Sequence, residues 1–94
     1  MKSILQTEKE CYKTGETYNL HKHHVFGGAN RKNSERYGLW VWLRADWHNM
    51  ENYGVHFNRD FDRELKAMAQ EAAMKEYEWT VDDFIRIFGK NYIL

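Results

Sequence analysis

All five histidines of this chain lie between positions 21 and 56, and their side-chain chemistry makes this the first feature to explain. His23 and His24 are adjacent, His21 precedes them, and His48 and His56 follow. Histidine is the commonest metal ligand, and its ordinary pKa lets it act as a general base near neutral pH. A lone histidine is usually an exposed polar residue. The confinement of all five instead predicts a site at which four of them converge on one ion.

Adjacent side chains on a β-strand point to opposite faces, so His23 and His24 cannot address an ion in the same way. The sequence therefore predicts a division of labour, in which one histidine binds a metal and the other addresses a water molecule. His48 and His56 are too far apart for one helical face, and a loop must bring them to His23. Three neutral imidazoles leave positions open on a divalent ion for phosphate oxygens and water, as metal-assisted hydrolysis requires.

Two strands are expected to position these residues. Residues 39–43 combine aromatic, β-branched and leucine side chains, which predicts a strand buried on one side by a helix and on the other by the N-terminal arm or a partner. A second strand over 20–25 pairs with it through a long connection. Within that connection, 31–37 is predicted to be a surface loop with one helical turn, started by Asn33 or Ser34. Residues 2–11 lack a clean period, so a short strand and an irregular arm both remain open.

Two helices are predicted after the last histidine. Asn58 or Asp60 can cap the first, which should run to about Lys75. Its apolar stripe has spacings of four, three and four residues and consists of Phe61, Leu65, Met68 and Ala72. Thr80 is expected to cap the second helix and Gly89 to end it. The apolar stripe of that helix consists of Phe84, Ile85 and Phe88.

Composition places limits on function. The 94 residues predict a single domain, 1–94, with one modest core. Zero formal net charge argues against a strongly basic surface that wraps nucleic acid, but basic residues surround the histidines. Four of them are candidates for phosphate contact, with simple solvation equally open: Lys22, Arg31, Lys32 and Arg36. No apolar run is long enough for a bilayer, and the single Cys11 excludes an intramolecular disulfide, so we expect a cytoplasmic protein without a membrane partner.

The motifs His-His-Val-Phe-Gly-Gly at 23–28 and Gly-Val-His-Phe-Asn at 54–58, with the hydrophobic run 39–43 and His48-Asn49 between them, resemble small phage-encoded HNH, or His-Me finger, endonucleases. The resemblance covers 11–73. It implies an α+β fold with a ββα-metal motif: a short antiparallel strand pair with a long loop, packed on a helix, here followed by a C-terminal helix. It also implies a metal-dependent DNA endonuclease.

In that family pattern His24 matches the general base, and His23, His48 and His56 match the ligands of one divalent cation, Mg²⁺, Mn²⁺, Ni²⁺ or Zn²⁺. The resemblance implies duplex or branched DNA as substrate and a phage or prophage protein in the cytoplasm of a bacterial host. Asn49 is the substitute for the family's central asparagine, in a supporting role.

The sequence departs from the family pattern at the paired cysteines that many relatives carry. Cys11 is followed by Thr14 where Cys-x-x-Cys is expected, so we expect no structural zinc ribbon. The packing of aromatic side chains would then stabilise the fold in place of a structural zinc ion. The candidates are Trp40, Trp42, Trp47 and Trp79.

Two alternatives to the enzyme remain at this stage. A catalytically inactive HNH-like module would bind nucleic acid or a phage or host protein, as zero net charge and the missing cysteines favour. The complete histidine set favours the enzyme over this module. In the second alternative, His24 is the fourth ligand of a structural zinc ion, together with His23, His48 and His56.

Overall fold

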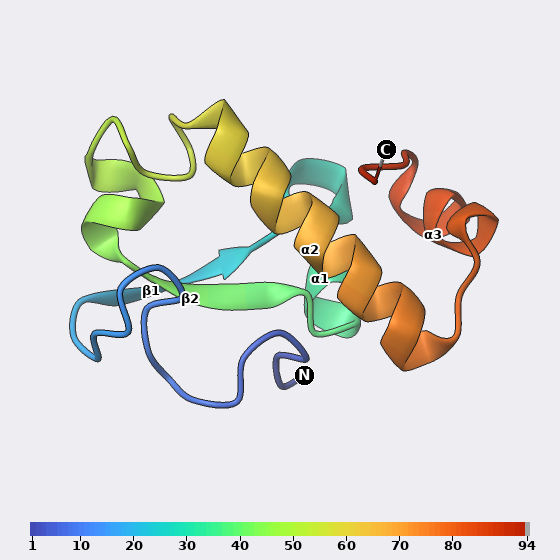
Figure 1. Cartoon of the computed structure of the whole chain (residues 1–94), viewed down its shortest axis with the longest axis horizontal. Coiled ribbons are helices and arrows are strands. Elements are labelled where there is room, and N and C mark those ends of the chain that lie inside the picture. Colours follow the sequence, from blue (N-terminus) through green and yellow to red (C-terminus); the bar gives the residue numbers. More distant parts are fainter. Residues whose placement is uncertain (94) are drawn as a thin grey trace.

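The computed structural model describes residues 1–93 and has an α+β architecture around a two-stranded antiparallel sheet (Figure 1). The main elements follow the order β1 (Leu20–His24), α1 (Arg31–Arg36), β2 (Trp40–Arg44), α2 (Arg59–Tyr77) and α3 (Val81–Phe88). Short helical turns precede α1 at Gly28–Asn30 (η1) and follow β2 at Asp46–Met50 (η2). Among these residues no helix combines the length and the apolar composition needed to cross a bilayer.

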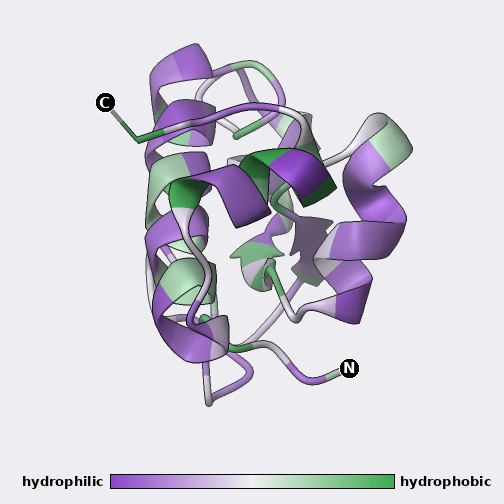
Figure 2. Ribbon diagram, turned by 90° about the vertical axis from the view of Figure 1, so that its right-hand side faces the viewer, coloured by the Kyte–Doolittle hydropathy of each residue, from purple (hydrophilic) through white to green (hydrophobic). Residues whose placement is uncertain are grey.

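The predicted strand pair is confirmed with its boundaries moved by one residue. In the register of β1 and β2, Leu20 faces Arg44 and His24 faces Trp40. The next pair outside the strands still forms a ladder bond, because the Val25 N–H donates to the Leu39 carbonyl at 3.0 Å. In Figure 2 the two strands lie at the centre of the molecule, with helices around them whose outward turns are mostly hydrophilic.

The N-terminal arm, residues 2–12, is irregular and lies along the outer edge of β2. The Trp42 carbonyl accepts from the Tyr12 N–H at 2.8 Å, and the Trp42 N–H donates to Gln6 Oε1 at 2.7 Å. The Arg44 N–H donates to the buried Cys11 Sγ at 3.2 Å. The arm thus satisfies the edge of the sheet and confirms the expectation that it packs against this strand.

Residues 31–37 differ from the predicted surface loop. The helix α1 begins at Arg31 rather than at Asn33 or Ser34, and Ser34 is fully buried. The Ser34 hydroxyl accepts from the Phe26 N–H and donates to the Phe26 carbonyl, both at 2.9 Å. A polar residue can be buried when both its donor and its acceptor are satisfied in this way. The polar composition of this segment gives no indication of such burial.

Both predicted C-terminal helices are present. Asn58 caps α2 by accepting from the Phe61 N–H at 3.1 Å, and the helix continues two residues past Lys75 to Tyr77. Its buried face includes Phe61 and Leu65 as predicted, but Ala72 is only half-buried. The inner face is completed instead by Ala69, Gln70 and Ala73.

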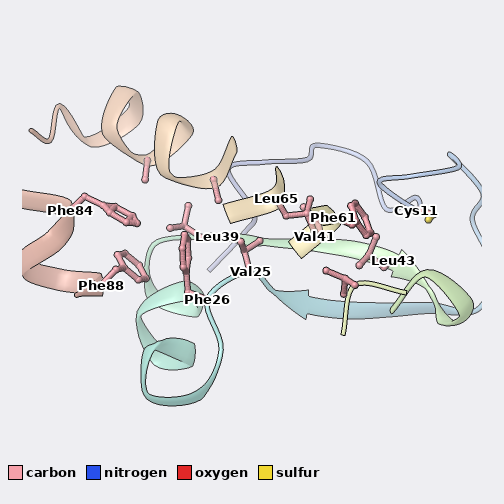
Figure 3. Close-up of a cluster of buried hydrophobic side chains, with 13 residues drawn as sticks. Cys11, Val25, Phe26, Leu39, Val41, Leu43, Phe61, Leu65, Phe84 and Phe88 are labelled. Atoms are coloured by element: carbon pink, nitrogen blue, oxygen red, sulfur yellow. The ribbon is translucent and has the colours of Figure 1, made fainter. Parts of the chain in front are cut away.

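The predicted capping box opens α3, where Thr80 and Asp83 exchange side-chain-to-backbone hydrogen bonds, and Gly89 ends it at φ 88°. Figure 3 shows how the core extends from Phe84 and Phe88 of α3, past Phe26, to Leu65 of α2 above β2. His21 and His23 of β1 are the cross-strand partners of the core residues Leu43 and Val41 of β2, so these histidines lie beside the core.

Candidate metal centre

Strand β1 sorts its polar residues onto two faces. His21 and His23 lie on one face and contact His48, whereas Lys22 and His24 lie on the other and contact α1. The alternation of side chains along a strand accounts for this separation. His23 and His24 therefore lie on opposite faces of the strand, as the sequence predicts.

A compact loop, residues 46–57, brings the two distant histidines together, and we call it the histidine loop. Its two ends are paired by backbone hydrogen bonds, from the Val55 N–H to the Trp47 carbonyl at 2.8 Å and from the His56 N–H to the His48 carbonyl at 3.1 Å. Gly54 lies where a Cβ would be 2.8 Å from the Asp46 carbonyl oxygen. Only glycine fits this close backbone approach, so the loop sequence is adapted to its closure.

Three imidazoles meet where the histidine loop covers β1. His23, His48 and His56 each offer a ring nitrogen, and these nitrogens all lie within 4.8 Å of one another. The closest pair is His48 Nε2 and His56 Nε2, 3.0 Å apart. His23 is buried, and its Nε2 is the one buried side-chain nitrogen or oxygen of residues 1–93 without a hydrogen-bond partner. An orphaned buried nitrogen of this kind calls for a ligand.

Two of these imidazoles, those of His23 and His48, are held in the neutral form that binds metals. Burial, followed by repulsion from His48 and His56, lowers the pKa of His23 to about 3. Burial, followed by the neighbouring His56 and His21, lowers the pKa of His48 to about 4. At neutral pH each ring therefore presents a lone pair rather than a charge.

The cluster fits a divalent cation. Nitrogens bound to one tetrahedral zinc at their usual distance are separated by about 3.3 Å, close to the spacing of the His48 and His56 nitrogens. A cation at the centre would also give His23 Nε2 its missing partner. Among the described residues, three histidines thus lie close enough together to hold a metal ion.

His21 completes the surroundings of this cluster. Its Nδ1 is 2.9 Å from His48 Nδ1, on the opposite side of the His48 ring from the nitrogen near His56. Such a contact fixes the orientation of a ligand and decides which of its nitrogens is free. The sequence marks His21 only as one member of the histidine group.

His24 stays outside the three-histidine cluster. Its Nε2 contacts Glu35 Oε1 of α1 at 2.9 Å, and its side chain is 11% exposed. It nevertheless lines one cavity together with His23, His48 and His56. The closed four-histidine zinc site is therefore not the arrangement found among residues 1–93, because His24 is not in the group of converging ligands.

The other predicted site residues are placed as follows. Lys22 and Arg31 line the same cavity, whereas Lys32 and Arg36 are exposed on α1 and line a neighbouring depression with His24. Lys22 also forms an ion pair with Glu35 at 2.6 Å. Asn49 is exposed on η2 and makes no hydrogen bond with residues 1–93, so the structure gives its predicted supporting role no contact.

Sequence reasoning missed Glu35. A lone glutamate among exposed basic residues is typical of a solvated surface, and only the packing of α1 beside β1 brings it to His24. Arg59 and Lys66 of α2 were missed as well, although they line a depression shared with His23 and His56. The position of Arg59, directly after the predicted cap Asn58 and three residues after His56, was the one available signal.

Comparisons of this chain with known protein families, with curated proteins and with solved structures gave no match.

Proposed function

We propose that this protein is a metal-dependent DNA endonuclease with an HNH-like, ββα-metal site. The observation that carries the proposal is the separation of roles within one cavity. The imidazoles of His23, His48 and His56 converge, and the buried Nε2 of His23 has no hydrogen-bond partner. His24 lines the same cavity but lies outside this cluster. A purely structural zinc site does not require the imidazole of His24, which is held apart from the three ligands.

In this proposal His23, His48 and His56 hold one divalent cation. When bound, the cation supplies a fixed positive charge that binds a nonbridging phosphate oxygen and stabilises charge on the departing oxygen. His24 accepts a proton from water as the water oxygen attacks phosphorus. The bond to the 3′-oxygen breaks, that oxygen takes up a proton from solvent, and the products are a 3′-hydroxyl and a 5′-phosphate.

Basic side chains at the cavity support a polyanionic substrate. Lys22 and Arg31 line the cavity itself, and Lys32 and Arg36 extend the basic surface along α1. These residues line two neighbouring depressions rather than a single pocket. We therefore propose a nucleic-acid backbone, DNA in particular, as the ligand of this face.

A cleavage assay tests the proposal. Purified protein is incubated with supercoiled, linear duplex, branched and single-stranded DNA, with Mg²⁺, Mn²⁺, Ni²⁺ or Zn²⁺ and with EDTA. We expect cation-dependent cleavage of at least one DNA form and a loss of about 10²–10⁴-fold in His24→Ala, the range for a general base. The variant, purified in parallel, also controls for contaminating nucleases.

Two outcomes would contradict the enzyme. One is the absence of cleavage in every combination, and the other is equal cleavage by wild type and His24→Ala. Binding of DNA without cleavage would instead assign the chain to the inactive HNH-like class of binding modules, which the neutral net charge favours.

A further inference from the structure

A carboxylate holds the histidine that the proposed function uses as its base. Glu35 Oε1 lies 2.9 Å from His24 Nε2 and 2.6 Å from Lys22 Nζ, so one oxygen is shared between the two side chains. The His24 side chain is largely buried, whereas that of Glu35 is 38% exposed. The contact therefore lies at the boundary between the cavity and solvent.

The ionisation of Glu35 fixes the direction of this hydrogen bond. Hydrogen bonds from Lys22 and then from His24 hold the pKa of the Glu35 carboxyl well below its ordinary value. An ionised carboxylate can only accept hydrogen bonds, so His24 Nε2 must be the protonated nitrogen and donate. In the neutral imidazole this leaves the lone pair on Nδ1.

We infer that Glu35 is a positioning residue for the proposed hydrolysis, which orients the His24 ring and keeps its Nδ1 free to accept a proton from water. The inference rests on the proposed function and adds a residue to it. Glu35 is not one of the three converging histidine ligands, and its proposed effect on the chemical step is transmitted through its contact with His24.

Glu35 can act in this way because α1 is firmly held. Its neighbour Ser34 is bonded to both backbone groups of Phe26, and the Leu39 N–H donates to the Ser34 carbonyl at 2.7 Å. Asn33 adds a bond from its side-chain amide to the Ile87 carbonyl at 3.2 Å. The backbone that carries Glu35 is thereby attached to the segment that follows β1, to the residue that precedes β2 and to α3.

The competing explanation is an ordinary surface ion pair between Glu35 and Lys22, which would contribute little to stability and nothing to the state of His24. The two explanations differ in what they predict for the His24 tautomer and for the chemical step. A surface ion pair leaves both unchanged when it is removed. A positioning residue alters both.

The test uses the full chain with Glu35→Ala, Glu35→Gln and a matched control, Glu71→Ala, on the exposed side of α2. Single-turnover DNA cleavage is measured against protein concentration, which separates the rate of the chemical step from binding. Zinc affinity is measured by titration calorimetry, and thermal unfolding reports the fold. Nitrogen-15 NMR of the histidine rings at neutral pH reports the His24 tautomer independently of activity.

We expect Glu35→Ala to slow the chemical step by about 10–100-fold. The protein concentration at half-saturation and the zinc affinity should change less than about threefold, because neither depends on the His24 lone pair. Glu35→Gln, which keeps an oxygen acceptor, should recover part of the rate. The wild-type NMR spectrum should show His24 protonated on Nε2, and Glu35→Ala should lose this preference.

The inference is overturned if wild-type protein cleaves DNA and Glu35→Ala cleaves equally fast, or if wild-type His24 is protonated on Nδ1. Loss of rate in Glu71→Ala to the same degree would also overturn it. If wild-type protein cleaves no DNA, the proposed function fails, and the NMR result then decides only whether the Glu35–His24 contact exists.

Discussion

The Nδ1 atoms of His21 and His48 lie 2.9 Å apart, although 27 residues separate them in the chain. This contact leaves the other nitrogen of His48 directed at His56. It is the arrangement by which an outer residue sets the tautomer and the ring orientation of a metal ligand.

We therefore expect His21→Ala to weaken zinc binding by about 10–100-fold without removing a ligand. His21→Asn, which keeps a hydrogen-bonding group near His48, should lose less. Calorimetric zinc titrations of the two variants give the comparison, with His24→Ala as the control whose zinc affinity should stay near that of wild type. Equal affinities for His21→Ala and wild type would show that the contact does not orient His48.

The ligand set also predicts the kind of cation. Three imidazole ligands without a carboxylate favour Zn²⁺, Ni²⁺ and similar ions over Mg²⁺, which prefers oxygen ligands. Zinc at 100 times its dissociation constant should stabilise the protein by about 2.7 kcal/mol, and EDTA should reverse this. The measurement is the thermal unfolding midpoint with each ion. His56→Ala should abolish the zinc response, and a larger response to Mg²⁺ than to Zn²⁺ would contradict the assignment.

Acid should destabilise the metal-free protein. Because burial lowers the pKa of His23 to about 3, unfolded chains bind a proton below pH 6.5 that the folded protein does not accept. This contribution to stability is complete above pH 6.5 and is lost as the pH falls toward 3. At pH 5.5 the loss from His23 alone is about 1 kcal/mol, and His48 acts in the same direction.

Urea unfolding at pH 7.5 and 5.5, in the presence of EDTA, measures this difference. The variant His23→Gln lacks the titrating group and should show a smaller difference between the two pH values. Equal unfolding free energies of the wild-type protein at both pH values would indicate that His23 is more accessible to protons than its burial implies.

Gly54 should be the least replaceable residue of the histidine loop. A Cβ there would lie 2.8 Å from the Asp46 carbonyl oxygen and 3.0 Å from that of His48. Gly54→Ala should cost about 1–3 kcal/mol of stability, and it should also weaken zinc binding because it moves His48 away from His56. Gly27→Ala is the matched control, since Gly27 is extended and a Cβ on it would meet nothing within 4 Å. Unfolding by urea and zinc titration of both variants test the difference.

The sequence predicts most of the secondary structure because each element carries its own local signal. The mixed aromatic and β-branched run of β2, the Asn58 cap of α2 and the Thr80 capping box of α3 are all visible in a short window. The convergence of His23, His48 and His56 was predictable from residue type, since histidines that are close in the sequence, on one strand and one loop, are typical of metal sites.

What the sequence does not predict depends on tertiary packing. Ser34 is polar and lies in a polar segment. Its burial follows only from its hydrogen bonds to the buried backbone N–H and carbonyl of Phe26. The inner face of α2 uses Ala69 and Ala73 rather than Ala72, because the crossing of α2 over the strands decides which small residues face the core. The partner of His24 was not predictable for the same reason, since Glu35 lies 11 residues further along the chain, within α1.

The arm that covers the outer edge of β2 also limits how the protein can associate with itself. An uncovered strand edge presents free N–H and carbonyl groups on which another chain can add a strand. Here Tyr12 and Gln6 occupy the backbone groups of Trp42 that would otherwise template such growth. The same short segment that completes the fold therefore also protects the β2 edge from the addition of another strand.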